Sequence, residues 1–165
     1  MGIKRIGRHL LHHHWKLKRI FTPDVLARIE QAIKDSERTH AGQLRFVVEG
    51  ALDGPPLWRN QLPRERALDV FSNLRIWDTA HNNGVLIYLL LADRDVEIIA
   101  DRGIHAKVGA ARWEAICQAM EAEFRQGRFE QGVMQGIAAV SGELAKYYPP
   151  HASDINELPD APVVL

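Results

Sequence analysis

The chain has 165 residues, a length that suits one compact domain with a buried core and short appendages. It contains 21 basic and 21 acidic residues, so its net charge indicates no class of partner. Its single cysteine excludes an intramolecular disulfide, and no apolar run approaches the ~18 residues that a membrane-spanning helix requires. We therefore expect a soluble, cytoplasmic protein.

Residues 1–21 form a basic segment with six lysine or arginine residues, four histidines and no acidic residue. Apolar residues recur in it at helical spacing, which predicts a basic amphipathic N-terminal helix. Such a helix could pack on the domain, dock on an anionic membrane surface or a protein partner, or bind nucleic acid. Aromatic residues interleaved for base stacking are absent, so we expect no nucleic acid partner. A docking role would place the protein at the inner face of the membrane.

Helix and strand patterns alternate along the rest of the chain. Thr22, Pro23 and Asp24 provide an N-cap, an N1 proline and a first-turn acid for a helix. Residues 149–165, rich in proline and aspartate, should form an extended C-terminal tail without helix or strand. The predicted elements are helices at 22–39, 63–77, 110–126 and 129–147, and strands at 43–49, 85–91 and 96–100.

The order of these elements predicts an α/β fold. The run at 85–91 is almost wholly apolar, as in a central strand that is covered on both faces. The short link at 92–95 forces its flanking strands to pair antiparallel, whereas the helix after 43–49 predicts a right-handed parallel crossover. We therefore expect an α/β/α sandwich over residues 22–148, with a small mixed β-sheet between helical layers.

Polar residues should gather at one end of this sheet. Asn82 and Asn83 precede the central strand, and the segment 101–105 follows its antiparallel partner, so the hairpin brings the two together. Asp78 should lie nearby. Carboxylate and amide oxygens suit hard cations such as Ca²⁺, although Asn-Asn-Gly is also a strong turn element for structural reasons alone. The candidate metal ligands here are Asp78, Asn82, Asn83, Asp101 and His105, and the candidate phosphate or ligand contact is Arg102.

The hairpin tip forms a second polar cluster at the other end of the sheet. Asp93 and Asp95 lie there, and we treat them as secondary candidates for a cation site. Aspartate and arginine at a hairpin tip are also common solvent-facing turn formers. Neither cluster matches an EF-hand loop, a phosphate-binding loop or a zinc pattern, so spacing alone identifies no site.

Two stretches of the chain resemble the TPM domain family. They are NNGVLIYLLLADRDVEIIADRGI at 82–104 and FRQGRFEQGVMQGI at 124–137. The family includes thylakoid-lumen proteins tied to photosystem II repair and many bacterial proteins. The resemblance covers about residues 22–147, and it implies an α/β/α sandwich with either calcium binding in an acidic cleft or an acid phosphatase activity.

The chain departs from the pattern of many family members within the candidate cleft. Asn82 occupies a position where many members have aspartate, and His105 occupies one where they have glutamate. Asp101 is an additional acid. Because hard-cation affinity depends on the number of carboxylates, these exchanges alter the affinity that the resemblance implies, and His105 could favour a softer metal.

Two functions follow from these observations. The first, which we favour, is a non-enzymatic binding or adaptor module with a divalent-metal cleft, acting on or near a membrane or a partner protein. The alternative is a metal-assisted phosphomonoesterase, in which Asp78, Asn82, Asn83 and Asp101 hold the cation, Arg102 contacts the phosphate and water is the nucleophile. The cofactor in either case would be Ca²⁺ or another divalent cation.

Overall fold

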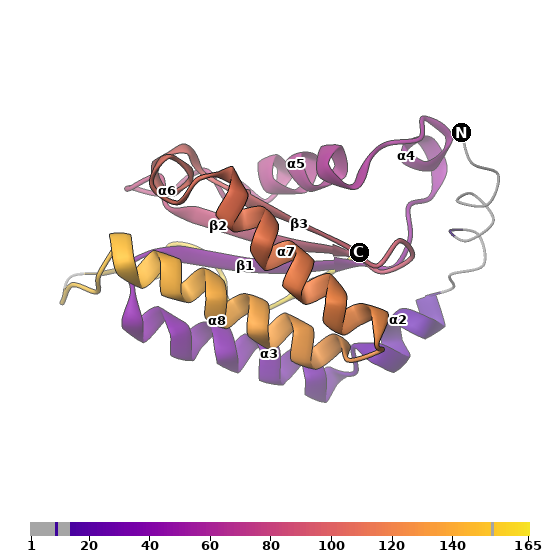
Figure 1. Cartoon of the computed structure of the whole chain (residues 1–165), viewed down its shortest axis with the longest axis horizontal. Helices are drawn as coiled ribbons and strands as arrows, with labels where there is room; N and C mark the ends of the chain where they lie inside the picture. The colour runs from indigo at the N-terminus through magenta and orange to yellow at the C-terminus, as the bar shows by residue number, and fades with distance from the viewer. Residues whose placement is uncertain (1–8, 10–13, 153) are drawn as a thin grey trace.

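The computed structural model describes residues 9, 14–152 and 154–165 of the chain. At its centre is a four-stranded mixed sheet with the order β3-β2-β1-β4 (Figure 1). The strands predicted from the sequence are confirmed, and a short fourth strand is added. They are β1 Gln43–Glu49, β2 Gly84–Leu90, β3 Asp95–Ala100 and β4 Val163–Val164.

The strand pairing confirms the predicted topology. β1 pairs with β2 in parallel, with Gln43 opposite Gly84, so the connection between them is a crossover. β3 pairs with β2 antiparallel, with Val85 opposite Ala100. The segments before β2 and after β3 therefore meet at one end of the sheet, and the hairpin tip lies at the other end.

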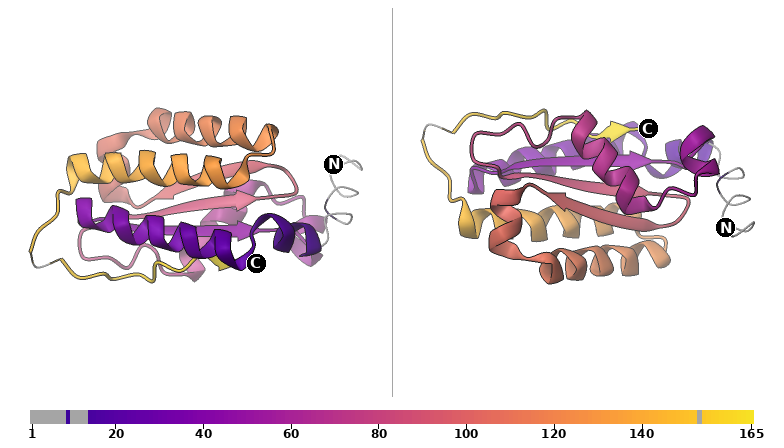
Figure 2. Two further views of the ribbon diagram at one scale, coloured as in Figure 1. Left: turned by 90° about the horizontal axis from the view of Figure 1, so that it is seen from below. Right: turned by 90° about the horizontal axis from the view of Figure 1, so that it is seen from above.

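Helices cover both faces of the sheet, which confirms the α/β/α architecture. α3, α7 and α8 lie side by side on one face, and α5 lies on the opposite face (Figures 1 and 2). The helices are α2 His14–Ile20, α3 Pro23–Ser36, α4 Gly54–Trp58, α5 Pro63–Asn73, α6 Arg102–Val108, α7 Ala110–Arg125 and α8 Phe129–Tyr147, with a 3-10 helix η1 at Glu37–Thr39.

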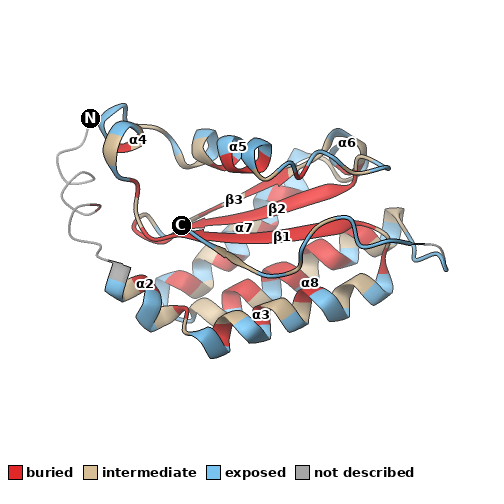
Figure 3. Ribbon diagram, turned by 180° about the vertical axis from the view of Figure 1, so that it is seen from behind, coloured by how far each residue is buried: buried red, intermediate tan, exposed pale blue. Residues whose placement is uncertain are grey.

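The central strand β2 separates two apolar clusters. Every residue of β2 is buried, as expected for a strand covered on both faces (Figure 3). Odd-numbered residues from Val85 to Leu89 pack in the cluster with α3, α7 and α8. Even-numbered residues from Leu86 to Leu90 pack with α5 on the other face. Because successive side chains of a strand point to opposite faces, β2 contributes side chains to both apolar clusters.

Two glycines let α8 approach α7 closely. A Cβ atom at Gly136 would lie 2.3 Å from Met120 Sδ, and one at Gly132 would lie 2.5 Å from the ring of Phe124. Met120 and Phe124 are fully buried on α7. The small residues of the 124–137 motif are therefore required by the packing of these two helices.

Three helical segments differ from the sequence prediction. α5 ends at Asn73 instead of extending to residue 77, because Arg75 adopts a positive φ of 54° and Ile76 turns back into the core. The proline-rich stretch 54–58, where the sequence pattern predicted neither helix nor strand, forms the short helix α4. α6 was not predicted, and it begins where the Asp101 carboxylate accepts a hydrogen bond from the backbone N–H of Arg102.

The C-terminal segment adds an unpredicted strand to the sheet. Val163 and Val164 pair in parallel with β1 at the edge opposite β3. Residues before this strand are also held on the sheet. The backbone N–H groups of Glu157 and Leu158 donate hydrogen bonds to Gln43 Oε1 of β1, both at 2.9 Å. A two-residue strand leaves too weak a sequence pattern to be recognised.

The described part of the N-terminal segment packs on the domain. Leu17 of α2 and the following Phe21 are buried in the cluster with α3. His9 is also buried, and its Nδ1 accepts a hydrogen bond from the backbone N–H of Leu52. The rest of the predicted helix lies outside the described residues. No helix in the described part of the chain is long and apolar enough to cross a membrane.

Candidate functional site

The hairpin places Asn82, Asn83, Asp101 and Arg102 at one end of the sheet. The backbone N–H of Asp101 donates to the carbonyl oxygen of Gly84 at 2.9 Å, which continues the β2–β3 ladder to the start of α6. The backbone N–H of Ile104 donates to the carbonyl of Asn82 at 3.2 Å. We call this region, formed by residues 81–84 and 101–104, the sheet-end site.

Asn83 is fully buried at this end of the sheet. Its backbone N–H donates to Thr79 Oγ1, and its side-chain Nδ2 donates to the carbonyl oxygen of Ala41 at 3.0 Å. These bonds fix the orientation of the amide. Its Oδ1 is buried and has no hydrogen-bond partner within residues 9, 14–152 and 154–165. A buried acceptor without a partner costs free energy unless a ligand or an ordered water satisfies it.

The side-chain oxygens of Asp101 and Asn82 differ in their hydrogen bonding. Asp101 Oδ1 caps α6, whereas Oδ2 is buried and lacks a hydrogen-bond partner among the described residues. Asn82 Oδ1 accepts a hydrogen bond of 3.3 Å from Arg102 Nε. The guanidinium of Arg102 thus binds the side-chain oxygen of Asn82, and its positive charge opposes a cation at this position.

Gly103 and Tyr148 close one side of the sheet-end site. A Cβ atom at Gly103 would lie 2.6 Å from the carbonyl oxygen of Asn82 and 2.9 Å from Tyr148 Oη. Burial raises the pKa of the Tyr148 hydroxyl, and the negative charge of Asp101 raises it further. The Lys107 ammonium lies over the Tyr148 ring, 4.4 Å from its centroid. The site is therefore compact, with a carboxylate, amide oxygens and a phenol together.

The other predicted site residues lie elsewhere. Asp78 is exposed, and its carboxylate accepts a hydrogen bond of 2.8 Å from Arg75. His105 is exposed on α6, and its side chain lines a groove beside β3. Asp93 is 3.2 Å from His9 Nε2 at the hairpin tip, and Asp95 begins β3. The structure therefore gathers only part of the predicted set at the sheet end.

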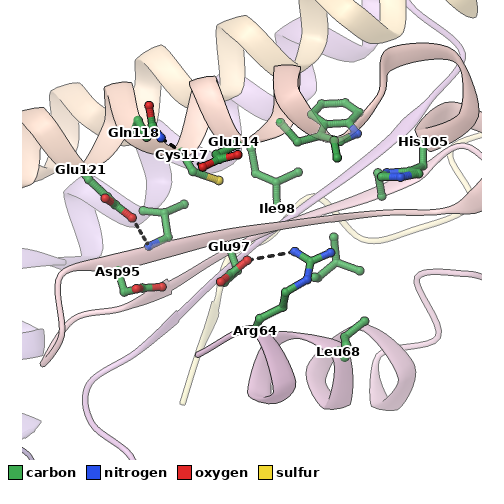
Figure 4. Close-up of a pocket in the computed structure, with 15 residues that line it drawn as sticks. Arg64, Leu68, Asp95, Glu97, Ile98, His105, Glu114, Cys117, Gln118 and Glu121 are labelled. Atoms are coloured by element: carbon green, nitrogen blue, oxygen red, sulfur yellow. Dashed lines mark hydrogen bonds and ion pairs between the residues drawn. The ribbon is translucent and has the colours of Figure 1, made fainter. Parts of the chain in front are cut away.

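The groove beside β3 was not predicted from the sequence. It has a volume of about 700 Å³ and lies between α5 and α7 along the edge of the sheet (Figure 4). Cys117 lines it, and burial raises the pKa of its thiol to about 12, so it is not a nucleophilic thiolate at neutral pH. The signal in the sequence was the pair Glu114 and Glu121 on α7, seven residues or about two helical turns apart. Which residues of β3 face this pair depends on the tertiary fold.

The oxygen atoms at the sheet end define which cation could bind there. Within the described residues, no group of three or more His, Cys, Asp or Glu side chains could hold a metal ion. Asp101 supplies one carboxylate oxygen and Asn83 one amide oxygen, and both are hard ligands without a donor partner in the described part of the chain. Oxygen ligands of this kind are typical of hard cations and not of softer transition metals.

The family model of the TPM domain matches residues 16–143. The chain belongs to the TPM domain family. A solved structure, that of the BA42 protein from the psychrophilic bacterium Bizionia argentinensis, is 34% identical, with a TM-score of 0.76. The match covers 87% of this chain and 94% of that one.

A second solved structure shares the TPM fold at lower similarity. It is the N-terminal domain of a protein from P. gingivalis, 21% identical with a TM-score of 0.57. That match covers 73% of this chain and 76% of the other. No curated protein matches the chain. Membership of the TPM family thus rests on the family model and the BA42 structure, and the second structure supports the fold alone.

Proposed function

We propose that this TPM domain is a non-enzymatic binding module whose sheet-end site holds a divalent cation weakly. Asp101 and Asn83 would be the protein ligands, and water would complete the coordination. Ca²⁺ fits best because it accepts carboxylate and amide oxygens in flexible geometry. A bound cation would let the module respond to cation concentration when it engages a partner.

The observation that supports this proposal is the pair of buried, unsatisfied acceptors. Asn83 Oδ1 and Asp101 Oδ2 are both buried, and neither has a hydrogen-bond donor in the described part of the chain. They belong to paired segments, because Asp101 bonds to Gly84, the neighbour of Asn83. Two acceptors at one sheet end suit a cation or a donor-rich ligand, since an acceptor is satisfied by positive charge or by a proton.

A phosphatase is the weaker alternative at the same site. Metal-assisted hydrolysis would need Asp78 among the cation ligands, but Arg75 already engages that carboxylate at the surface. Arg102, the candidate phosphate contact, is bound to Asn82. If the purified protein hydrolyses a generic phosphomonoester and Asp101→Ala abolishes this activity, the binding module is not a full account.

Titration of the ¹⁵N-labelled chain with CaCl₂ tests the proposal. We expect saturable shifts of the amide signals of residues 81–84 and 101–104, with little change at the hairpin tip, residues 92–95. If the amide signals at the sheet end do not move at Ca²⁺ concentrations up to 20 mM, the cation site is excluded. Paramagnetic Mn²⁺ should broaden the same signals first if both ions use one site.

We also propose that the exposed face of α2 docks the module on an anionic surface at the cytoplasmic face of a membrane. Leu17 points into the core, whereas Trp15 is 57% exposed, with the Arg19 guanidinium 5.9 Å from its ring centroid. Lys18 is exposed beside them. An exposed tryptophan among cations is suited to an interface between apolar and charged groups. Binding to a protein partner is the alternative outcome.

A further inference from the structure

One edge of the sheet opens into the groove between α5 and α7. At the opposite edge, β4 already pairs with β1, so the chain itself covers that edge. β3 is the other edge strand, and Asp95–Ala100 line the groove of about 700 Å³. An edge strand beside a groove offers main-chain hydrogen-bonding groups to an incoming strand.

The ladder with β2 determines which main-chain groups face the groove. The N–H of Asp101 points inward to Gly84, so the N–H groups of Val96, Ile98 and Ala100 point outward by alternation. Val96 follows this rule, since its N–H donates to Glu121 Oε1 across the groove at 3.3 Å (Figure 4). The Cys117 thiol accepts the backbone hydrogen bond from Ile98. Side chains of α7 thus occupy main-chain sites that a strand would use.

Trp113 adds an unsatisfied donor to the groove. It lines the groove from α7 and is only 4% exposed. Its Nε1–H is buried, and no acceptor for it exists among the residues that the structure describes. Buried indole N–H groups usually have a partner, so a carbonyl oxygen supplied by a ligand would satisfy this one.

The charge of the groove defines the ligand further. Four carboxylates line it, and two of them are already paired, Glu97 with Arg64 at 3.0 Å and Glu121 with Arg125 at 3.1 Å. Figure 4 shows acidic side chains on both sides of β3, including Glu114 and Glu121 from α7 and Glu97 from the strand. Acidic walls on both sides favour lysine or arginine side chains, which would alternate between the two walls in an extended peptide.

We propose that the groove binds an extended lysine- or arginine-rich segment of a partner protein, which adds to β3 as a further strand. The carbonyls of the segment would replace the Glu121 and Cys117 side chains as acceptors for the outward N–H groups of β3. One further carbonyl would accept from Trp113. Its N–H groups would donate to the outward carbonyls of β3. Six residues, the length of β3, would span ~20 Å. The proposal is independent of the cation at the sheet end.

Glu121 bears on whether the groove is a docking surface or a protected edge. Its bond to Val96 at 3.3 Å is long, and charged residues at an edge can serve to prevent strand pairing. If Glu121 only protects the edge, no extended peptide should bind regardless of charge. If Glu121 instead occupies the docking position only while no peptide is bound, a basic peptide should displace its carboxylate from Val96 and form an ion pair with it.

Peptide titration of the full chain, with EDTA present, tests the proposal. The probe is a capped hexapeptide of alternating lysine and valine, and the control is the matching glutamate and valine peptide. We expect saturable shifts of the amide signals of Val96, Ile98 and Ala100 and of the Trp113 indole signal, with the lysine peptide only. The affinity should fall at least fivefold in Glu114→Lys and several-fold between 50 and 300 mM salt.

A proline variant separates strand addition from plain charge attraction. Ala100→Pro removes one outward N–H without breaking the β2–β3 ladder, and proline is tolerated at such edge positions. We expect at least threefold weaker binding in a variant that keeps the wild-type spectrum elsewhere. Equal binding of both peptides, unmoved β3 signals, or wild-type affinity in Glu114→Lys would each overturn the proposal. Should Ala100→Pro fail to fold, Glu114→Lys and the control peptide still decide.

Discussion

Arg66 on α5 and Glu49 on β1 form a bidentate ion pair beneath the helix, with Nε and Nη2 at 2.9 and 3.0 Å from the two carboxylate oxygens. The Tyr88 hydroxyl donates to the same carboxylate at 2.5 Å. The side chains of Arg66 and Glu49 are only 22% and 9% exposed. This network joins α5 to the centre of the sheet through polar groups that are hydrogen-bonded to one another.

Glu49→Ala should strongly destabilise the fold. It leaves the Arg66 guanidinium and the Tyr88 hydroxyl without their shared acceptor, which costs about 3–5 kcal/mol of unfolding free energy. Tyr88→Phe removes one hydrogen bond and should cost about 1 kcal/mol. Urea unfolding measures both values. Glu97→Ala is the matched control, since it breaks the more exposed Arg64 pair and should cost less than about 1 kcal/mol. Similar losses for Glu49→Ala and Glu97→Ala would contradict the account.

Two substitutions should strengthen cation binding at the sheet-end site. Asn82→Asp introduces a carboxylate, and Arg102→Gln removes the guanidinium that donates a hydrogen bond to Asn82 Oδ1. Each should lower the dissociation constant for Ca²⁺ by about tenfold. Asn82→Asp adds a carboxylate, and Arg102→Gln removes a positive charge that repels the cation. Calorimetric titration measures the change. Arg94→Gln at the hairpin tip is the control for a lost positive charge and should leave the constant unaltered.

Stability should respond to pH through Glu37. Burial raises the pKa of this carboxyl to about 8, and the nearby Asp160 carboxylate adds to the shift. The folded chain therefore keeps a proton that the unfolded chain releases above its ordinary pKa of 4.5. The contribution is fully present below about pH 4.5 and is lost as pH rises towards 8.

Glu37→Gln should remove this dependence. Relative to wild type, the free energy of unfolding of the variant should increase by about 1 kcal/mol as the pH rises from 5 to 9. This value is reduced to allow for the partial exposure of Glu37. Urea midpoints at pH 5, 7 and 9 measure it. Glu30→Gln, on the exposed side of α3, is the control. A constant difference between Glu37→Gln and wild type at all three pH values would show that folding does not raise the pKa of Glu37.

The exposed face of α2 can be tested without removing its core residue. A variant with Trp15→Ala, Lys18→Glu and Arg19→Glu keeps Leu17, which is buried in the core. We expect at least a fivefold loss of co-sedimentation with vesicles of 30% phosphatidylserine. Lys146→Glu on α8 is a control for net charge. Unchanged sedimentation of the triple variant would remove the membrane proposal and leave a protein partner as the remaining role.

The sequence was sufficient for the layered fold because its strongest signals are local. The apolar run at 85–91 predicts a buried central strand, and the short link after it predicts the hairpin. The end of α5 was missed, since it depends on the positive φ of Arg75, and β4 was missed because two residues provide no period.

The site was harder to predict because it depends on which oxygens remain unpaired. Sequence spacing identified Asn83 and Asp101 equally with Asp78, yet Asp78 is bound by Arg75. The groove beside β3 depends on the packing of α7 against the sheet edge, which no spacing reveals. Residue types at the end of a predicted strand could thus be identified from the sequence, whereas their hydrogen-bond partners could not.

The most direct test of the central claim is the Ca²⁺ titration of wild type and Asp101→Asn, followed by the amide signals of residues 81–84 and 101–104. Asparagine keeps the shape of the side chain and can still cap α6, so the fold should be retained. We predict millimolar binding in the wild type and at least a tenfold weaker response in the variant. Equal responses, or shifts confined to the hairpin tip, would contradict a cation site at this end of the sheet.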